Sequence, residues 1–306
     1  MTSGAHDKTI AFIGLGSMGL PMAKNLLARG FAVRGFDTRP AATEALAAAG
    51  GVATRSVAEA CAGANIALLM VVNATQAESV LFSDGAVRAL PDQGIVVLMA
   101  TCPPRSVEAL AARVIEAGRR FVDAPVSGGV AGAEAGTLTI MAAAPRASLD
   151  AVSDALAAMG DKVVHVGDRP GQGAMVKTVN QLLCGVHLAV AAEAFSLAAK
   201  VGVDLGVMLQ ILSGSAASSW MLRDRGPRMV EADPRVTSAV DIFVKDLGIV
   251  LEAGRDSKAA LPFAALAHQL FLSVSGRGDG GADDSQVIRA YHGLRSEEHT
   301  SELQSL

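Results

Sequence analysis

The amino-acid sequence predicts an α/β domain with a doubly wound, mainly parallel sheet over residues 1–168, followed by an all-helical domain over residues 169–294. In the first part, short apolar runs typical of strands alternate with helical stretches, which is the pattern of a doubly wound sheet. After Pro170 the strand signals stop, and an almost unbroken apolar stretch of helical length runs over residues 174–199. A chain of 306 residues is long enough for two domains of ordinary size.

The first predicted strand leads into a glycine signature. The strand covers Thr9–Ile13, an amphipathic helix follows over residues 19–28, and Gly14, Gly16 and Gly19 between them have the spacing G-x-G-x-x-G. In such a turn the first glycine permits the tight bend, the second lets a pyrophosphate approach the backbone, and the third lets helix and strand pack closely. The helix start then offers N–H groups to the phosphates. An ordinary glycine-rich turn is the alternative, but the context favours a Rossmann-type cofactor loop made of Gly14, Leu15, Gly16, Ser17, Met18 and Gly19.

The end of the second predicted strand indicates which cofactor binds. Asp37 follows the run "AVRGF", about twenty residues beyond the glycines. A carboxylate there accepts hydrogen bonds from a ribose 2′-hydroxyl and repels a 2′-phosphate, so the sequence favours NAD over NADP. Arg39 lies close enough in the chain to weaken this preference.

Three more buried strands are predicted, in "ANIALLMVVN", "GIVVLMAT" and "RRFVDAPVS". Ligands of doubly wound sheets bind beyond the carboxyl ends of the strands. Val72, Asn73 and Thr101 occupy such ends and are therefore candidates to line the cofactor cleft, although packing within a loop is an equally good interpretation of each.

The composition excludes several classes of function. The formal net charge is −4, and the basic residues are scattered, so neither nucleic acid nor an anionic membrane is indicated as a partner. The three cysteines show no spacing typical of metal or redox sites, and a reducing cytoplasm fits them. No secretory segment is expected, and polar residues interrupt the long apolar helix that would otherwise suit a membrane.

The long apolar helix carries a polar face near its start. Lys177, Asn180 and Gln181 stand at positions i, i+3 and i+4, so they share one side of the helix. Burial lowers the pKa of an amine, and a lysine that sheds its proton near neutral pH can act as a general acid or base, with the two amides orienting a substrate hydroxyl. The alternative is a lysine that extends to solvent while the amides satisfy a neighbour.

Two segments near the end of the chain are polar. The run "GRGDGGADD" over residues 276–284 is expected to form a surface loop. The last residues, "RSEEHTSELQSL" over 295–306, break with the preceding composition and resemble a translated sequencing adapter. We expect this tail to be non-native, with the natural C-terminus missing, and a natural polar tail is the alternative.

Four segments together resemble the signature motifs of the β-hydroxyacid dehydrogenases, which include 3-hydroxyisobutyrate, tartronate-semialdehyde and 6-phosphogluconate enzymes. They are "GLGSMGLPMAKNL", "DAPVSGGVAGAEAGTLTIM", "GQGAMVKTVNQLL" and "VDIFVKDLGIVL", in that order along residues 8–294. The stretches "VVNATQAESVLF" and "SSWMLRDR" are similar to one branch that oxidises a four-carbon sugar acid. The resemblance implies a cytoplasmic, NAD-dependent enzyme that assembles as a homodimer or homotetramer.

The resemblance also implies roles for individual residues. Lys177 matches the catalytic lysine, Thr101 a nicotinamide contact, and Lys245 a lysine that reaches the cofactor cleft, although alone it would be interpreted as a solvated helix charge. Ser127, Gly128 and Gly129 match the substrate-binding turn, where successive N–H groups can hold a carboxylate; without the resemblance, that turn would be interpreted as structural.

Gln181 stands where many relatives have asparagine, and other members share the Asn-Gln pair. A non-catalytic, cofactor-holding module is the rival hypothesis, and the presence of both Lys177 and the Ser-Gly-Gly turn favours the enzyme.

Overall fold

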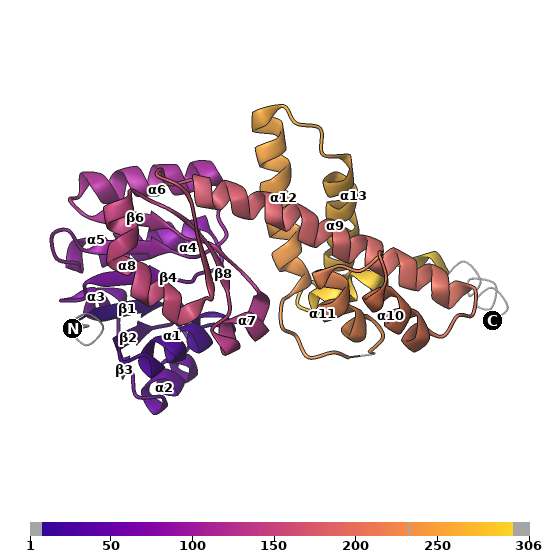
Figure 1. Cartoon of the computed structure of the whole chain (residues 1–306), viewed down its shortest axis with the longest axis horizontal. Coiled ribbons are helices and arrows are strands. Elements are labelled where there is room, and N and C mark those ends of the chain that lie inside the picture. Colours follow the sequence, from indigo (N-terminus) through magenta and orange to yellow (C-terminus); the bar gives the residue numbers. More distant parts are fainter. Residues whose placement is uncertain (1–7, 232, 296–306) are drawn as a thin grey trace, which may run out of the picture. The chain divides into compact units, whose positions relative to one another are not determined.

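The computed structural model describes residues 8–231 and 233–295, and the side chains of 292–295 are not part of the description. The chain forms two compact units, the first ending at Thr178 and the second beginning at Val179 (Figure 1). The polar tail predicted to be non-native lies outside the described residues from position 296 onward.

The first unit is a nine-stranded sheet with helices on both faces. Its strands are β1 (Thr9–Ile13), β2 (Ala32–Phe36), β3 (Val52–Ala53), β4 (Ile66–Leu69), β5 (Ile95–Leu98), β6 (Arg120–Asp123), β7 (Val126–Ser127), β8 (Thr139–Ala143) and β9 (Lys162–Gly167). Its helices are α1 (Gly19–Ala28), α2 (Pro40–Ala48), α3 (Val57–Cys61), α4 (Ala74–Glu78) with the π-helical turn η1 (Ser79–Ser83), α5 (Ala86–Ala89), α6 (Pro104–Glu116), α7 (Gly129–Ala135) and α8 (Arg146–Met159).

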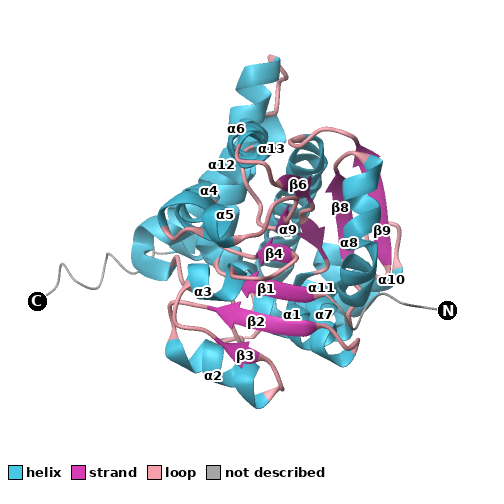
Figure 2. Cartoon of the chain, turned by 90° about the vertical axis from the view of Figure 1, so that its left-hand side faces the viewer, coloured by secondary structure: helices cyan, strands magenta, loops and turns pink. Residues whose placement is uncertain are grey.

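The strand order is β3-β2-β1-β4-β5-β6-β8-β7, with β9 beside β8. Strands β1 to β6 pair in parallel, and β8 pairs antiparallel with both β6 and β7. Figure 2 shows β3, β2, β1 and β4 side by side. The chain reverses its direction of winding between β1 and β4, as a doubly wound sheet requires. The predicted run "RRFVDAPVS" is split into β6 and β7 at Pro125, which has no N–H to donate to a ladder.

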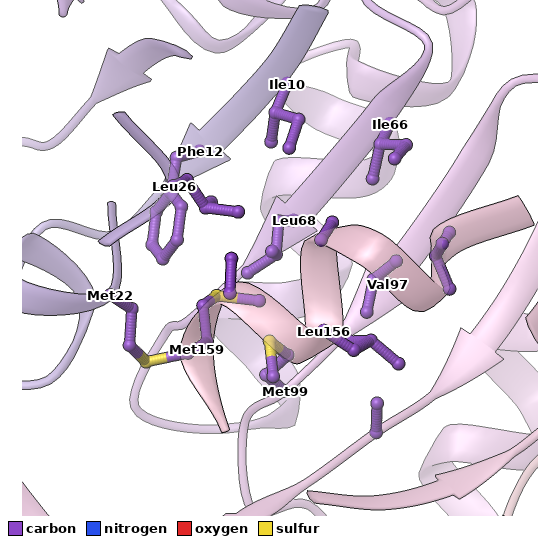
Figure 3. Packing of buried hydrophobic residues seen from close by; sticks show 14 of the residues in the cluster. Ile10, Phe12, Met22, Leu26, Ile66, Leu68, Val97, Met99, Leu156 and Met159 are labelled. Atoms are coloured by element: carbon purple, nitrogen blue, oxygen red, sulfur yellow. The ribbon is translucent and has the colours of Figure 1, made fainter. Parts of the chain in front are cut away.

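Alternation along each strand builds a separate apolar core on either face of the sheet. Ile10 and Phe12 of β1 face one core, whereas Ala11 and Ile13 face the other. The first core is covered by α1, α2 and α8, as Figure 3 shows for the contacts of Phe12 with the helical side chains around it. The second core is covered by α3, α4, α5 and α6. Because both faces are buried, the central strands are apolar throughout, as in other parallel sheets.

Helix α9 (Gln172–Lys200) begins on the first unit and continues into the second. Ala174 belongs to the second core of the sheet, so the first turns of α9 pack with the strands. The two compact units therefore divide within α9, after Thr178, and the domain boundary expected at residue 168 stays a prediction. By length and composition α9 could also cross a membrane, a test that core helices pass as well, and 39% of its apolar window is buried.

The second unit is helical. After α9 come α10 (Leu205–Gly214), α11 (Trp220–Met229), α12 (Val240–Ser257), α13 (Pro262–Val274), the π-helical turn η2 (Ser275–Asp279) and the 3₁₀ segment η3 (Asp284–Arg295). Phe243 of α12 and Phe271 of α13 stack in its core with ring centroids 4.9 Å apart.

The expectation that residues 276–284 form a polar surface loop is wrong for the end of this segment. Asp283 and Asp284 are 1% and 0% exposed. Arg228 and Arg225 of α11 pair with them, with N–O distances of 3.1 and 3.0 Å. A buried carboxylate needs such a partner, and no pattern in the sequence indicated that α11 supplies two.

Candidate active site

The carboxyl ends of the parallel strands lie level with one another. The cross-strand register joins Phe36, Ile13, Leu69, Leu98 and Asp123 into one row through β2, β1, β4, β5 and β6. The loops that follow these strands therefore leave the sheet at the same edge, where doubly wound sheets bind their ligands. The predicted site residues up to Thr101 all belong to these loops.

The glycine turn after β1 fits a dinucleotide phosphate group. Gly14 has φ +93°, and a Cβ there would lie 2.4 Å from the carbonyl oxygen of Met70. A Cβ on Gly19 would lie 1.9 Å from the carbonyl oxygen of Gly14, so both positions require glycine for packing. At Gly16 a Cβ would meet only the Arg39 side chain, at 3.7 Å. Among the described side chains none caps the start of α1, so no cap competes with a phosphate for the N–H groups of its first turn.

Asp37 is held at the next loop by four hydrogen bonds. Its Oδ2 accepts from the Leu15 N–H at 2.8 Å and from Arg39 Nη2 at 3.2 Å. Its Oδ1 accepts from the backbone N and the Nε of Arg39 at 2.9 and 3.0 Å. Burial by itself raises the pKa of Asp37, but these hydrogen bonds outweigh it and leave the pKa lowered. The carboxylate stays ionised, and Arg39 occupies acceptor positions that a ribose hydroxyl would use.

The loop after β4 uses its polar groups locally. Asn73 Oδ1 accepts from the Gln76 N–H at 2.9 Å and so caps α4, while the Val72 N–H donates to Gln76 Oε1 at 2.9 Å. The side chain of Val72 is exposed, and Thr101 after β5 is half-buried. Asn73 therefore caps a helix, and Gln76 holds the backbone of the same loop. Gln76 was not identified from the sequence.

The Ser-Gly-Gly turn lies between β7 and α7. Ser127 ends β7 in register with Thr139 of β8. Gly128 and Gly129 both have positive φ, +131° and +62°, which side chains rarely tolerate. The turn therefore needs glycine for its backbone, and its successive N–H groups remain a candidate carboxylate site.

The polar face of α9 is largely buried. Lys177 is 7% and Gln181 8% exposed. Asn180 Nδ2 donates to Gln181 Oε1 at 3.0 Å and to Cys184 Sγ at 3.3 Å. The amides at i+3 and i+4 therefore form one hydrogen-bonded group on the lysine-bearing helix.

Within the second unit, Asp246 links two predicted site residues. Its Oδ2 accepts from Gln181 Nε2 at 2.5 Å, and its Oδ1 accepts from Lys245 Nζ at 2.5 Å. Asp246 is 2% exposed. Sequence reasoning gave it no role, although a carboxylate beside Lys245 on an apolar helix was the available signal.

These features together define the class of protein to which the chain belongs. A doubly wound sheet with an open glycine turn at its switch point, and an acidic residue after β2, is the framework of a dinucleotide-dependent oxidoreductase.

Comparison with known proteins places the chain within that class. Residues 9–167 match the model of the NAD binding domain of 6-phosphogluconate dehydrogenase, and residues 171–291 match the NAD-binding model of NADP-dependent 3-hydroxyisobutyrate dehydrogenase. The chain belongs to the 3-hydroxyisobutyrate dehydrogenase family of β-hydroxyacid dehydrogenases. The predicted family, fold class, oxidoreductase activity and nicotinamide cofactor are thereby confirmed.

Similar proteins cover nearly the whole chain. An L-threonate dehydrogenase of Cupriavidus necator is 45% identical, over 94% of this chain and 97% of its own length. A 2-(hydroxymethyl)glutarate dehydrogenase of Eubacterium barkeri is 38% identical, over 92% of this chain and 94% of its own. The crystal structure of a 3-hydroxyisobutyrate dehydrogenase from Salmonella typhimurium superimposes with a TM-score of 0.89 at 38% identity, covering 92% of this chain and 99% of that one.

The Asp37–Arg39 pair makes a prediction about cofactor preference. Arg39→Ala frees acceptor positions on Asp37 for the ribose of NADH and removes a cation from the place that a 2′-phosphate would occupy. The pair is exposed on the Arg39 side, so breaking it costs about 0.3–1 kcal/mol, which corresponds to tightening of NADH by about two- to fivefold. NADPH binding is expected to weaken. Fluorescence titration of both reduced cofactors measures the two dissociation constants.

The matched control is Arg29→Ala, an exposed arginine in the same unit, which should leave both constants unchanged. Weaker NADH binding in Arg39→Ala would contradict the prediction and assign Arg39 a direct contact with the cofactor.

Proposed function

We propose that this protein oxidises L-threonate to its 2-keto acid, 2-dehydro-L-erythronate, with NAD as hydride acceptor. The observation that carries the proposal is the 45% identity to the L-threonate dehydrogenase of Cupriavidus necator over 94% of the chain. Enzymes of the same name from Pectobacterium atrosepticum and Haemophilus influenzae are each 38% identical. The runner-up activities are 3-hydroxyisobutyrate oxidation and tartronate-semialdehyde reduction. The first is named for a Pseudomonas aeruginosa enzyme that is 33% identical and for the Salmonella typhimurium structure that is 38% identical.

The proposed roles follow the chemistry of each group. The N–H groups of the Ser127–Gly129 turn bind the substrate carboxylate. Lys177 in its neutral form removes the proton of the substrate hydroxyl, while Asn180 and Gln181 orient that hydroxyl. NAD, when bound, supplies the acceptor for the hydride that leaves the same carbon. The alcohol becomes a ketone, and the released proton stays on Lys177.

The cofactor is proposed to contact Gly14–Gly19, Asp37 and the loops at Val72–Asn73 and Thr101. Support comes from the shared carboxyl edge of the sheet and from the start of α1, which no described side chain caps. The role predicted for Lys245 stays a prediction based on its place in the family motif. In the same scheme residues 1–168 bind the cofactor, residues 169–294 serve substrate binding and assembly, and the enzyme acts in the cytoplasm.

A substrate panel tests the proposal. L-threonate, D-erythronate, glycerate, 3-hydroxyisobutyrate and tartronate semialdehyde are assayed with NAD(H) and NADP(H), following the absorbance of the reduced nicotinamide. We expect kcat/KM for L-threonate with NAD to exceed that for each other acid by about tenfold or more, because a polar group left unpaired in the site costs more than a kcal/mol. No reduction of NAD with L-threonate would defeat the proposed substrate.

Substitution of the lysine tests the mechanism. Lys177→Ala is expected to lower kcat by about 10²–10⁴-fold and to leave the dissociation constant of NADH unchanged, since a general base acts on the substrate and not on the cofactor. Lys177→Arg carries a permanent positive charge and cannot accept the hydroxyl proton at working pH, so the same loss is expected. Lys162→Ala on the exposed strand β9 is the control. Near-normal turnover in either Lys177 variant would exclude the assigned role.

We also propose that the protein assembles as a homodimer or homotetramer through its helical unit. Exposed apolar side chains recur along one stripe of α9 at Val179, Leu183, Val190 and Leu197, each between 50% and 63% exposed. Their spacings of four and seven residues are those of a seam between helices. An apolar stripe of this length is typical of a surface covered by another subunit.

Light scattering during gel filtration checks this assembly. The wild type is expected to elute as a dimer or larger, and Leu197→Asp to shift the mass towards the monomer because it places a charge in an apolar seam. The control Glu252→Lys changes an exposed position of α12 and should not alter the mass. A monomeric wild type at micromolar concentration would contradict the proposal.

A further inference from the structure

A buried carboxylate lies at the start of α9 and has no role in the chemistry above. Asp123, the last residue of β6, is 1% exposed. Its Oδ2 accepts from the N–H groups of Gly171 and Ala174, each at 2.9 Å, and Gly173 contributes a third backbone N–H. Burial raises the pKa of Asp123 to about 6, against the lowering effect of these hydrogen bonds. A strand residue thus caps the first turn of a 29-residue helix.

A second contact holds the helix at the same place. A Cβ added to Gly173 would lie 2.6 Å from the carbonyl oxygen of Met141 and 2.9 Å from that of Asp123. The backbone of α9 therefore approaches β6 and β8 more closely than any side chain at this position would allow. The carboxylate and the close approach act together, since they fix the same turn from two directions.

The anchored turn lies next to the predicted catalytic lysine. Lys177 follows Ala174 by one helical turn, a rise of about 4.5 Å along the axis. Asp123 itself stands in the row of strand ends that includes Leu98, at the edge where the cofactor loops emerge.

Asp123 is also tied to the proposed carboxylate-binding turn. Strand β8 pairs with Asp123 through Ala143 and with Ser127 through Thr139. The strand that positions the Ser-Gly-Gly turn therefore also positions the carboxylate that caps α9. One residue sets the start of the lysine helix relative to the turn expected to hold the substrate.

We propose that Asp123 is a positioning residue that fixes the lysine-bearing start of α9 to the carboxyl edge of the sheet. The expected effect of Asp123 on turnover rests on the proposed function, in which Lys177 is the general base. The N–H groups of Gly171 and Ala174 share Oδ2 of Asp123. An amide at this position either turns its NH₂ group towards both donors or keeps an uncharged oxygen there, which is a weaker acceptor than a carboxylate. A displacement of about 1 Å at a reacting group costs about 10²-fold in rate, so a small shift of this turn is sufficient to impair the reaction.

The test compares Asp123→Asn with the wild type. With the preferred substrate of the panel, kcat is expected to fall by about 10- to 100-fold, while KM for the substrate changes little and the dissociation constant of NADH is unchanged, because the glycine loop follows a different strand. Hydrogen–deuterium exchange over residues 171–178 should accelerate by about tenfold or more relative to α1. Gly173→Ala disturbs the same contact from the helix side and should reproduce the pattern if Asp123→Asn folds poorly.

Ser56→Ala is the matched control. Ser56 caps α3 in the same unit by accepting from the Glu59 N–H at 3.1 Å, and its loss should lower Tm without changing kcat. Each variant is assayed at the same number of degrees below its own Tm. The proposal would be overturned if kcat were unchanged in both Asp123→Asn and Gly173→Ala, or if their loss of kcat were no greater than that of Ser56→Ala.

A wild type that oxidises no acid of the panel defeats the proposed function instead. The positioning role of Asp123 is then tested by hydrogen–deuterium exchange alone. Faster exchange of residues 171–178 in Asp123→Asn supports that role, and unchanged exchange contradicts it.

Discussion

The level row of strand ends is the constraint on which the rest of this molecule depends. Parallel pairing from β2 to β6 brings the carboxyl ends of strands that are far apart in the chain to one edge. Each loop is locally unremarkable: a glycine turn, an acidic residue, a helix cap. They form a site only because the register leaves no strand longer or shorter than its neighbours at this edge. A slip of one residue would also exchange the two faces of a strand and bury the wrong side chains, so the two apolar cores enforce the geometry of the site.

Features encoded over a short stretch of chain were predictable from the sequence, and features made by distant partners were not. The glycine spacing predicted the β1–α1 turn because Gly14 and Gly19 are needed by their immediate surroundings. The attachment of α9 to the sheet was not predictable, because the carboxylate that holds the start of this helix comes from Asp123, about fifty residues before it. The surface-loop interpretation of residues 276–284 was wrong for Asp283 and Asp284 for the same reason, since their cationic partners lie on α11. Period and spacing carry no information about such partners.

The balance at Asp37 shows why a motif alone does not fix cofactor preference. Discrimination between NAD and NADP is the difference between the two binding affinities, and Arg39 is expected to act on both. It competes with a ribose hydroxyl for the carboxylate, and it partly neutralises the charge that would repel a 2′-phosphate. Because the guanidinium is mostly solvent-exposed, the pair is weak, and a bound cofactor can displace it at small cost. The carboxylate is therefore expected to favour NAD, by a margin that Arg39 reduces.

Two buried carboxylates organise the predicted catalytic residues of α9, one in each unit. Asp123 accepts from backbone N–H groups at the start of α9 and so fixes where the helix starts. Asp246 accepts from two side chains, the Gln181 amide and the Lys245 ammonium, and so fixes the orientation of those groups. The distinction has a physical consequence. Substituting Gln181 or Lys245 removes one hydrogen-bond donor from the buried carboxylate of Asp246, whereas replacing an existing side chain on the first turn of α9, with Gly173 kept, leaves the backbone donors of Asp123 in place. Side chains on the first turn of α9 can therefore vary without loosening the start of the helix, while a change at Gln181 or Lys245 alters the hydrogen bonding of Asp246.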